Sequence, residues 1–207
     1  MIFGSRCAGC RVRGPALCRT CRFALLARPA TAAPDDVLVA TAYTGRVRAV
    51  LTGFKYENRR PVAAHLAGIL ANRIEESDRR APGTLDIDLV TWAPTSPGRR
   101  RRRGFDQAEL IARGVAARLG VPCRGLLERR GGPSQTGRSR AERLHGPRFA
   151  AHAGAAGRRI LVIDDVVTTG ATLHAAAAAL RAGGASSVVR AAVAATPAAL
   201  RSVELVA

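Results

Sequence analysis

Residues 160–172 read ILVIDDVVTTGAT, and this stretch decides the fold. Its first part, residues 160–163, is a short apolar run typical of a buried central strand. Two adjacent carboxylates and a Thr- and Gly-rich loop follow, and residues 172–182 then form an alanine-rich helical stretch before Gly183-Gly184. In open α/β sheets, ligands bind at the carboxyl ends of the strands. The order of strand, carboxylates, loop and helix therefore predicts a βα unit with a ligand site at the end of its strand.

The loop has the features of a phosphate site, because its backbone N–H groups and the start of the next helix would face an anion. Hydroxyl donors and a glycine that permits close approach lie in it: Thr168, Thr169, Thr172 and Gly170. A ribose 5-phosphate suits the whole arrangement, since its phosphate would bind the N–H groups while its 2- and 3-hydroxyls donate to Asp164 and Asp165. The alternative is an acidic pair at a helix N-terminus without a ligand. A P-loop is excluded, because Gly-Lys-Ser/Thr is missing.

The rest of the chain alternates strands with helices. Residues 37–43, 87–92 and 188–195 are predicted strands. One helix is predicted to begin at Pro61 and to fade over residues 75–80. Another is predicted to begin at the capping box Asp106-x-x-Glu109 and to end at Gly120. This alternation is typical of an α/β fold with a mostly parallel sheet and flanking helices.

The 207-residue chain has room for one such domain and a small appendage. No apolar run approaches the ~20 residues that cross a bilayer, and residues 1–10 lack the apolar core of a signal peptide, so we expect a cytoplasmic protein without a membrane span. The net charge of +18 favours a polyanionic partner. Because 32 of the 33 basic residues are arginines, the alternative is codon bias of a GC-rich genome. Lys55 is the single lysine. Either it was retained by chance in a chain where codon bias favours arginine, or it was retained because it contacts a phosphate.

Four of the five cysteines form two CxxC pairs separated by seven residues: Cys7, Cys10, Cys18 and Cys21. Such pairs predict a tetrahedral Zn²⁺ site, and four thiolates leave no open coordination position, so its role would be structural. Two disulfides are the alternative, but they need an oxidising compartment. Cys123 stands alone and is predicted to be a core or strand residue rather than a nucleophile.

At residues 160–172 the chain resembles the type I phosphoribosyltransferases, whose signature for 5-phosphoribosyl-1-pyrophosphate (PRPP) has this form. The two CxxC pairs, followed by YTGRVR at 43–48, FKY at 54–56 and RGFDQA at 103–108, are similar to the ComF family, which is implicated in DNA uptake during natural transformation. The resemblance covers nearly the whole chain. Two departures stand out. Asp106 replaces an Asn of the family, and we expect little structural effect because both residues are good helix N-caps. Residues 143–149 lack a second family Asn, whose role is therefore unassigned here.

The resemblance implies that PRPP, with Mg²⁺, binds at a defined set of residues: Asp164, Asp165, Val167, Thr168, Thr169, Gly170, Ala171 and Thr172. It also implies a basic loop that binds pyrophosphate, to which we add the single lysine: Thr95, Ser96, Arg100, Arg103 and Lys55. A flexible loop within residues 129–149 would close over PRPP with four polar residues: Gln135, Arg138, Arg140 and Arg143. We predict no residue as a catalytic acid, base or nucleophile.

The arginine-rich segments allow two interpretations each. The five consecutive arginines of residues 99–103 would hold the diphosphate, or single-stranded nucleic acid across the mouth of the site. The alternative is a disordered, solvated loop. Residues 129–149 are either a lid that excludes water from a carbocation-like centre or plain disorder.

Two functions remain open. One is a phosphoribosyltransferase, in which pyrophosphate leaves through an oxocarbenium-like state and a nitrogen nucleophile attacks the ribose. The other is a non-catalytic protein that binds PRPP or a nucleotide phosphate together with single-stranded DNA and other DNA-uptake proteins. No residue marks a base-recognition pocket, so the acceptor is unassigned. In both cases we expect a zinc-binding knuckle (1–28), a hood-like segment of linker, strand and helix (29–84) and a phosphoribosyltransferase-type α/β domain (85–207).

Overall fold

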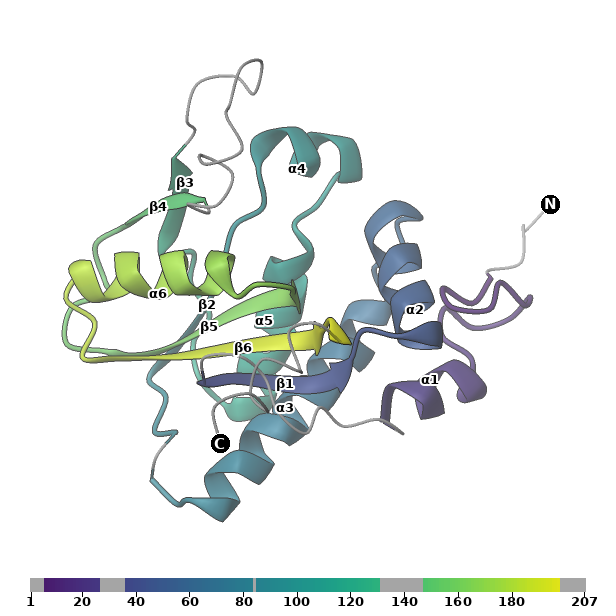
Figure 1. Cartoon of the computed structure of the whole chain (residues 1–207), viewed down its shortest axis with the longest axis horizontal. Coiled ribbons are helices and arrows are strands. Elements are labelled where there is room, and N and C mark those ends of the chain that lie inside the picture. Colours follow the sequence, from purple (N-terminus) through teal and green to yellow (C-terminus); the bar gives the residue numbers. More distant parts are fainter. Residues whose placement is uncertain (1–5, 27–35, 84, 131–146, 198–207) are drawn as a thin grey trace.

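A four-stranded parallel sheet forms the centre of the computed structural model, which describes residues 6–26, 36–83, 85–130 and 147–197 (Figure 1). Its strands are β1 (Val37–Ala42), β6 (Ser187–Ala195), β5 (Arg159–Val167) and β2 (Leu89–Trp92), in that spatial order. The strand of the 160–172 stretch, β5, therefore lies inside the sheet. The chain beyond β2 bridges back to it, since Cys123 pairs with Val90. The predicted α/β fold with a mostly parallel sheet is confirmed.

Helices cover both faces of this sheet. Along β5, Leu161 and Ile163 pack in one core with α3 (Val62–Arg80) and α5 (Gln107–Leu119), whereas Ile160 and Val162 pack in a second core with α6 (Ala171–Ala182). Figure 1 shows α6 on one side of the strands and α3 and α5 on the other. Because strand side chains alternate between faces, a strand buried on both faces reads as an unbroken apolar run.

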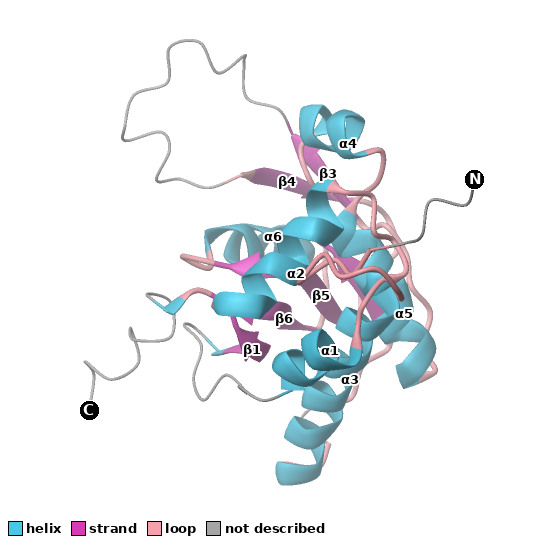
Figure 2. Ribbon diagram, turned by 90° about the vertical axis from the view of Figure 1, so that its right-hand side faces the viewer, coloured by secondary structure: helices cyan, strands magenta, loops and turns pink. Residues whose placement is uncertain are grey.

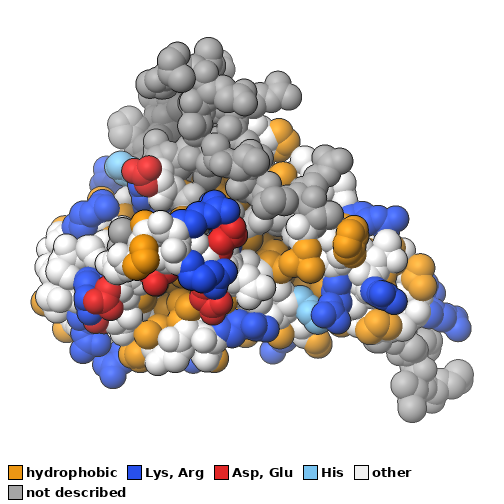
Figure 3. Space-filling view, turned by 90° about the horizontal axis from the view of Figure 1, so that it is seen from below, with side chains coloured by type: hydrophobic (Ala, Val, Ile, Leu, Met, Phe, Trp, Pro, Cys, Tyr) orange, Lys and Arg blue, Asp and Glu red, His pale blue; other side chains and the backbone are white. Residues whose placement is uncertain are grey.

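The two helices predicted from caps are present. At α5, Asp106 accepts a hydrogen bond from the Ala108 N–H (3.1 Å), and Gly120 closes the helix in the left-handed conformation. The prediction that the other helix fades over residues 75–80 was wrong, because α3 continues to Arg80. Pairs of opposite charge one turn apart, such as Arg80 with Glu76 (2.5 Å), stabilise this polar end. Figure 3 shows acidic and basic side chains intermixed on the lower face of the molecule.

Three helices were not predicted from the sequence: α1 (Arg19–Leu26), α2 (Gly45–Tyr56) and α4 (Pro97–Arg103). In α2 the buried residues Val47, Val50, Leu51 and Phe54 repeat at helical spacing, which could have revealed it. Figure 2 shows α1, α2 and α3 gathered beside the sheet. Residues of both α1 and α2 therefore pack in the same hydrophobic core as α3.

The segment predicted to lack structure, residues 129–149, has paired strands at its ends. β3 (Leu127–Arg130) and β4 (Arg148–Ala151) form an antiparallel pair in which Arg129 lies opposite Phe149. Four predicted loop residues lie outside the described residues: Gln135, Arg138, Arg140 and Arg143. None of the described helices is long and apolar enough to cross a membrane.

Candidate functional site

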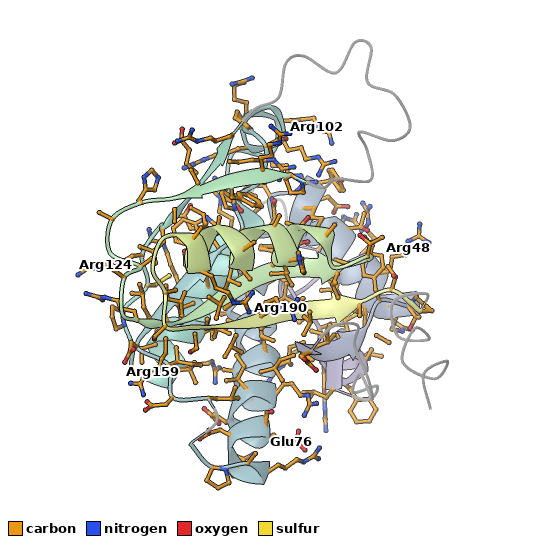
Figure 4. The ribbon with its side chains drawn as sticks, turned by 60° about the vertical axis from the view of Figure 1, so that its left-hand side comes forward. Arg48, Glu76, Arg102, Arg124, Arg159 and Arg190 are labelled. Atoms are coloured by element: carbon orange, nitrogen blue, oxygen red, sulfur yellow. The ribbon has the colours of Figure 1, made fainter. Side chains whose placement is uncertain are left out.

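A pocket of about 330 Å³ opens at the carboxyl ends of β2 and β5. One part of its wall is acidic, with Asp164, Asp165 and Asp106. Four cationic side chains line it from α2, β3 and α4 (Pro97–Arg103): Lys55, Arg99, Arg103 and Arg129. Figure 4 shows arginines spread over the whole molecule, with Arg102 of α4 at one end and Arg159, where β5 begins, far from it. The pocket can therefore accept a ligand that carries both hydroxyl groups and phosphates.

The two adjacent carboxylates lie within β5 rather than after it. The strand was predicted to end at residue 163, but it continues to Val167, with Asp164 opposite Ala192 of β6 and Val167 opposite Ala195. Because residues 191–195 of β6 are apolar and buried, they offer a partner along this whole length. Asp164 and Asp165 both line the pocket, and Asp165 reaches Lys55 of α2.

Asp165 forms an ion pair with the single lysine. Lys55 Nζ lies 3.0 Å from Asp165 Oδ1, and the two side chains are only 16% and 13% exposed. Lys55 lies in the last turn of α2, so this helix brings the ammonium group to the end of β5. The structure therefore brings Lys55 together with the predicted ribose-binding pair.

Asp164 is half-buried and lies beside a second carboxylate. Burial and the charge of Asp165 raise the pKa of Asp164, although the Asp165 N–H donates to its Oδ1 (2.8 Å) and the nearby charge of Lys55 opposes the shift. Because its pKa is raised, Asp164 takes up a proton more readily than an ordinary aspartate. When ionised, it can bind a cation or accept a hydrogen bond from a hydroxyl group.

The turn between β5 and α6 forms one side of the pocket. Thr168 and Thr172 line it, and Gly170 has a φ of 76°, in the left-handed region that favours glycine. Gly170 also stands at the N-cap of the 12-residue α6, so the first N–H groups of that helix have no capping side chain from this position. Val167, in contrast, is buried at 3% exposure and packs in the core with α6.

The arginine run forms a helix, so the prediction of a loop at residues 99–103 was wrong. Pro97 occupies the first turn of α4, and Gly104 ends it in the left-handed conformation, with its N–H bonded to the Arg100 carbonyl (2.8 Å). Arginine is a strong helix former, and proline at the start with glycine after the end suits a short helix. Arg99 and Arg103, four positions apart, line the pocket with Thr95, whereas Ser96 and Arg100 are not among its lining residues.

An aromatic side chain joins α2 to α4 beside the pocket. Arg103 donates to the Tyr56 hydroxyl (3.1 Å) and to Gln107 Oε1 (2.8 Å), and its guanidinium lies 4.9 Å from the centre of the Tyr56 ring. Arg102 lies over the same ring at 5.6 Å. The hydrogen bond from Arg103 lowers the pKa of Tyr56. Tyr56 is nevertheless 56% exposed, so part of its surface is open to a ligand.

Sequence reasoning missed Arg129. This residue of β3 donates to the Pro94 carbonyl (3.3 Å), packs over the Phe149 ring at 5.6 Å and reaches the pocket. Burial lowers its pKa, and Asp164 and Asp106 are the nearby acids that oppose this shift. A strand in an arginine-rich segment gives no sequence signal that distinguishes Arg129 from its neighbours.

Asp106 does more than cap α5. Its Oδ2 accepts from the Thr95 N–H (2.8 Å), so one buried side chain ties the segment after β2 to the start of the helix. Burial raises the pKa of Asp106. Asp106 therefore adds a third carboxyl group to the lining of the pocket.

The four cysteines of the two CxxC pairs form one cluster. Their Sγ atoms all lie within 4.8 Å of one another, and Cys10 and Cys18 are 3.6 Å apart. A tetrahedron of thiolates around Zn²⁺ has edges of about 3.8 Å, given Zn–S distances of about 2.3 Å. All five cysteines are free among the described residues. This geometry fits a metal such as zinc and not two formed disulfides.

One family model and several solved structures match parts of this chain. Residues 106–204 match the family model of the "Phosphoribosyl transferase domain". Glutamine PRPP amidotransferase from B. subtilis, solved with ADP and GMP, is a similar structure (23% identity, 64% of this chain and 26% of that chain, TM-score 0.44). Purine phosphoribosyltransferase from Pyrococcus horikoshii (17%, 66% and 75%, 0.41) and an adenine phosphoribosyltransferase (18%, 68% and 75%, 0.44) are others. The similarity takes in only 26% of the amidotransferase chain. No curated protein sequence matches this chain.

Proposed function

We propose that this type I phosphoribosyltransferase-like protein binds PRPP in the pocket at the end of β5 and transfers its phosphoribosyl group with release of pyrophosphate. One observation carries the proposal: two adjacent carboxylates, Asp164 and Asp165, share a pocket with the Thr- and Gly-rich turn that begins α6. The 5-phosphate would bind this turn, and the ribose hydroxyls would donate to the carboxylates.

The cationic wall would hold the diphosphate. Arg99 and Arg103 of α4 line the pocket together with Thr95, and Arg129 faces them from β3. Cations fixed around a leaving diphosphate stabilise the charge that develops on it. This assignment replaces Ser96 and Arg100 by Arg99 and Arg129 in the proposed pyrophosphate site.

Mg²⁺ fits the same pocket, because carboxylate oxygens of Asp164 and Asp165 together with phosphate oxygens are the ligands that this hard cation prefers. It would neutralise diphosphate charge, which favours departure of the leaving group. The protein's own residues would orient the ribose and keep water from its anomeric carbon.

Titration with PRPP, with and without Mg²⁺, tests binding, and a screen for pyrophosphate release across nucleobases tests transfer. The matched variants are Asp165→Asn, inside the pocket, and Arg101→Ser, an exposed residue of α4 outside it. Tight binding that Asp165→Asn weakens and Arg101→Ser does not, with release in the presence of a base, supports the enzyme. Absence of PRPP binding to the wild-type protein would refute the proposal.

A second candidate is a non-catalytic protein that binds PRPP and single-stranded DNA, with a role in natural transformation like that of the ComF proteins. The observation that favours it is the surface of α4, where Arg100, Arg101 and Arg102 are exposed beside the half-exposed ring of Tyr56. Arginines bind the backbone of a single strand, and an aromatic ring stacks on its bases. PRPP binding without pyrophosphate release for any base would favour this function and its DNA-uptake partners.

We also propose a role for each part of the chain. Residues 1–28 would hold a structural Zn²⁺, residues 29–84 would complete the pocket through Lys55, and residues 85–207 would carry the phosphoribosyl site. Four reduced thiolates need a reducing compartment, so we propose that the protein works in the cytoplasm.

A further inference from the structure

We infer that the cysteine cluster is a positioning element for the pocket: through α2, the bound metal fixes Lys55 against Asp165. The inference rests on the proposed PRPP site for its functional consequence, but its structural part is independent of that site. It starts from the contacts of α2, which touches the cysteine knuckle at Arg46, Val50 and Gly53 and reaches the pocket through Lys55 in its last turn.

Three contacts join the knuckle to α2. In the first turn, the Arg46 guanidinium lies 3.9 Å from Cys21 Sγ. A cation there offsets the negative charge of four thiolates around one Zn²⁺. Just beyond the last turn, Glu57 forms an ion pair with Arg11, which follows the first CxxC pair. The knuckle thus holds both ends of the helix.

The middle contact is a close approach of two backbones. A Cβ added to Gly53 would lie 2.4 Å from the Ala8 carbonyl oxygen, so only glycine fits there. A Cβ on Gly9 would likewise lie 2.7 Å from Cys21 Sγ and 2.8 Å from a methyl group of Val50. Backbone atoms cannot move aside as a flexible side chain does. A shift of the knuckle therefore shifts α2, or breaks this contact.

Lys55 lies on the other side of the helix from this contact. Two residues of an α-helix span about 200° of rotation, so Gly53 and Lys55 point in nearly opposite directions. The helix is consequently clamped between the knuckle and Asp165. Leu51 and Phe54 of α2 are fully buried in a core that also takes in Cys7, Ala8 and Cys21 of the knuckle.

The knuckle itself depends on the metal. Its described backbone contacts include the hydrogen bonds from Cys7 N to the Val12 carbonyl (2.9 Å) and from Ala8 N to the Ala16 carbonyl (2.8 Å). Small cysteine sites of this kind draw most of their folding free energy from the metal. Removing it should release the knuckle from α2 while the sheet and its helices stay folded.

The single lysine provides a direct test. Protein labelled with ¹⁵N and ¹³C in lysine gives one side-chain signal, that of Lys55, because the chain has no other lysine. We expect the zinc-loaded protein to show an ammonium signal immobilised by Asp165, and chelation to move that signal to the position of a free lysine. Circular dichroism must show that the helices remain. An unchanged lysine signal after complete zinc removal would overturn the inference.

A matched pair of variants gives the same test without a chelator. Gly53→Ala adds a methyl group that the Ala8 carbonyl cannot accommodate, whereas Thr52→Ala changes the exposed neighbour in the same helix turn. Alanine has a higher helix propensity than glycine, so the substitution does not weaken the helix itself. Any loss of the immobilised Lys55 signal in Gly53→Ala therefore comes from the disturbed contact with the knuckle. We expect Gly53→Ala to shift the lysine signal and Thr52→Ala to leave it in place. Equal signals in both variants would contradict the inference.

PRPP titration then tests whether the position of the Lys55 side chain affects the affinity for PRPP. Zinc removal should weaken PRPP binding about tenfold in the wild-type protein but hardly at all in Lys55→Met, because the contact is already lost there. Equal weakening in both backgrounds would show that the metal does not act through Lys55. A lysine signal that moves in a protein that never binds PRPP would uphold the positioning role and refute the proposed function instead.

Discussion

Lys55 Nζ lies 3.0 Å from Asp165 Oδ1, although 110 positions of sequence separate the two residues. The pair joins the last turn of α2 to the end of β5, and both side chains are largely shielded from water. A compact ammonium group next to a carboxylate and open to a pocket differs from a planar guanidinium in reach and in hydrogen-bond geometry. This position gives a physical reason for one lysine in a chain that otherwise uses arginine.

We predict that neither Lys55→Met nor Lys55→Arg retains normal PRPP binding. Methionine leaves Asp165 without its cation and should lower the free energy of unfolding by about 1–3 kcal/mol. Arginine keeps the positive charge, but its larger planar guanidinium cannot occupy the position of the Lys55 ammonium group beside Asp165. We expect PRPP binding to be at least about tenfold weaker in both variants, or about 1.4 kcal/mol. Calorimetric titration and denaturant unfolding measure these effects. Full affinity in Lys55→Arg would mean that only the charge matters.

We predict that Asp164→Asn combined with Asp165→Asn abolishes PRPP binding without unfolding the protein. The two carboxylates lie in a strand whose hydrogen bonds with β6 do not involve their side chains. Amides of the same shape keep that pairing but lose the charge that ribose hydroxyls and Mg²⁺ need. Near-native circular dichroism with no detectable binding is the expected result. Binding as tight as that of the wild-type protein would rule out the ribose assignment.

The stability conferred by Asp164 should depend on pH in a defined direction. Its pKa rises from 3.8 to about 7 on folding, because of burial and the charge of Asp165. An acid with a raised folded-state pKa favours folding only while protonated, so this contribution is present below the unfolded value and is lost as pH rises through the folded value. We therefore expect Asp164→Asn to match the wild-type stability near pH 4 and to exceed it by about 1–3 kcal/mol at pH 8.

Denaturant unfolding of both proteins between pH 4 and pH 8 measures this difference. Glu76→Gln, which removes a carboxylate of α3 outside the pocket, is the control for loss of an acidic side chain elsewhere. A constant difference between Asp164→Asn and the wild-type protein across this range would mean that Asp164 titrates normally.

We predict one Zn²⁺ per chain at the four clustered cysteines. The sulfur–sulfur distances suit a tetrahedral site of four cysteine ligands. Elemental analysis of the native protein should give a ratio near one, and Cys10→Ser should lose the metal. Two disulfides by thiol counting, with no zinc, would contradict this prediction.

The parallel sheet was predictable because local patterns and tertiary packing agree in this part of the chain. The apolar run of β5, the helix after it and the capped helix α5 each carry their own signal. The length of β5 was not predictable, since Asp164 and Asp165 belong to a strand only because β6 offers a partner beside them. The helix α4 was not predictable for a different reason: a run of arginines has no apolar periodicity that would indicate a helix.

One side of the pocket was predicted from local chemistry, and on the other side the family resemblance indicated Thr95, Arg103 and Lys55, which line the pocket. Local chemistry identified the carboxylates and the Thr- and Gly-rich turn, whereas the opposite wall comes from distant segments. Arg129 arrives with β3, and Lys55 arrives with a helix that the sequence analysis overlooked. A contact over 110 positions leaves no trace in any local window. The single use of lysine and the FKY motif at 54–56 were the signals that drew attention to residue 55.

We predict that the exposed face of α4 binds single-stranded DNA. The triple variant of Arg100, Arg101 and Arg102 to Ser removes three cations that lie outside the pocket. Single-strand binding loses about 0.7 in log–log salt slope per phosphate contact, so the slope should become shallower by about 2 and affinity should fall alike for all sequences. PRPP binding should change little. Fluorescence anisotropy over a range of salt concentrations measures both slopes.

The control is a triple variant of Arg48, Arg124 and Arg181 to Ser, which changes the net charge equally at exposed positions on α2, after α5 and on α6. If α4 is the binding surface, only the first variant should alter the slope strongly. Tyr56→Leu should further weaken binding without changing the slope, because a stacking ring contributes contacts but no charge. Equal effects of the two triple variants would mean that the protein attracts DNA by its net charge of +18 alone and that α4 has no special part.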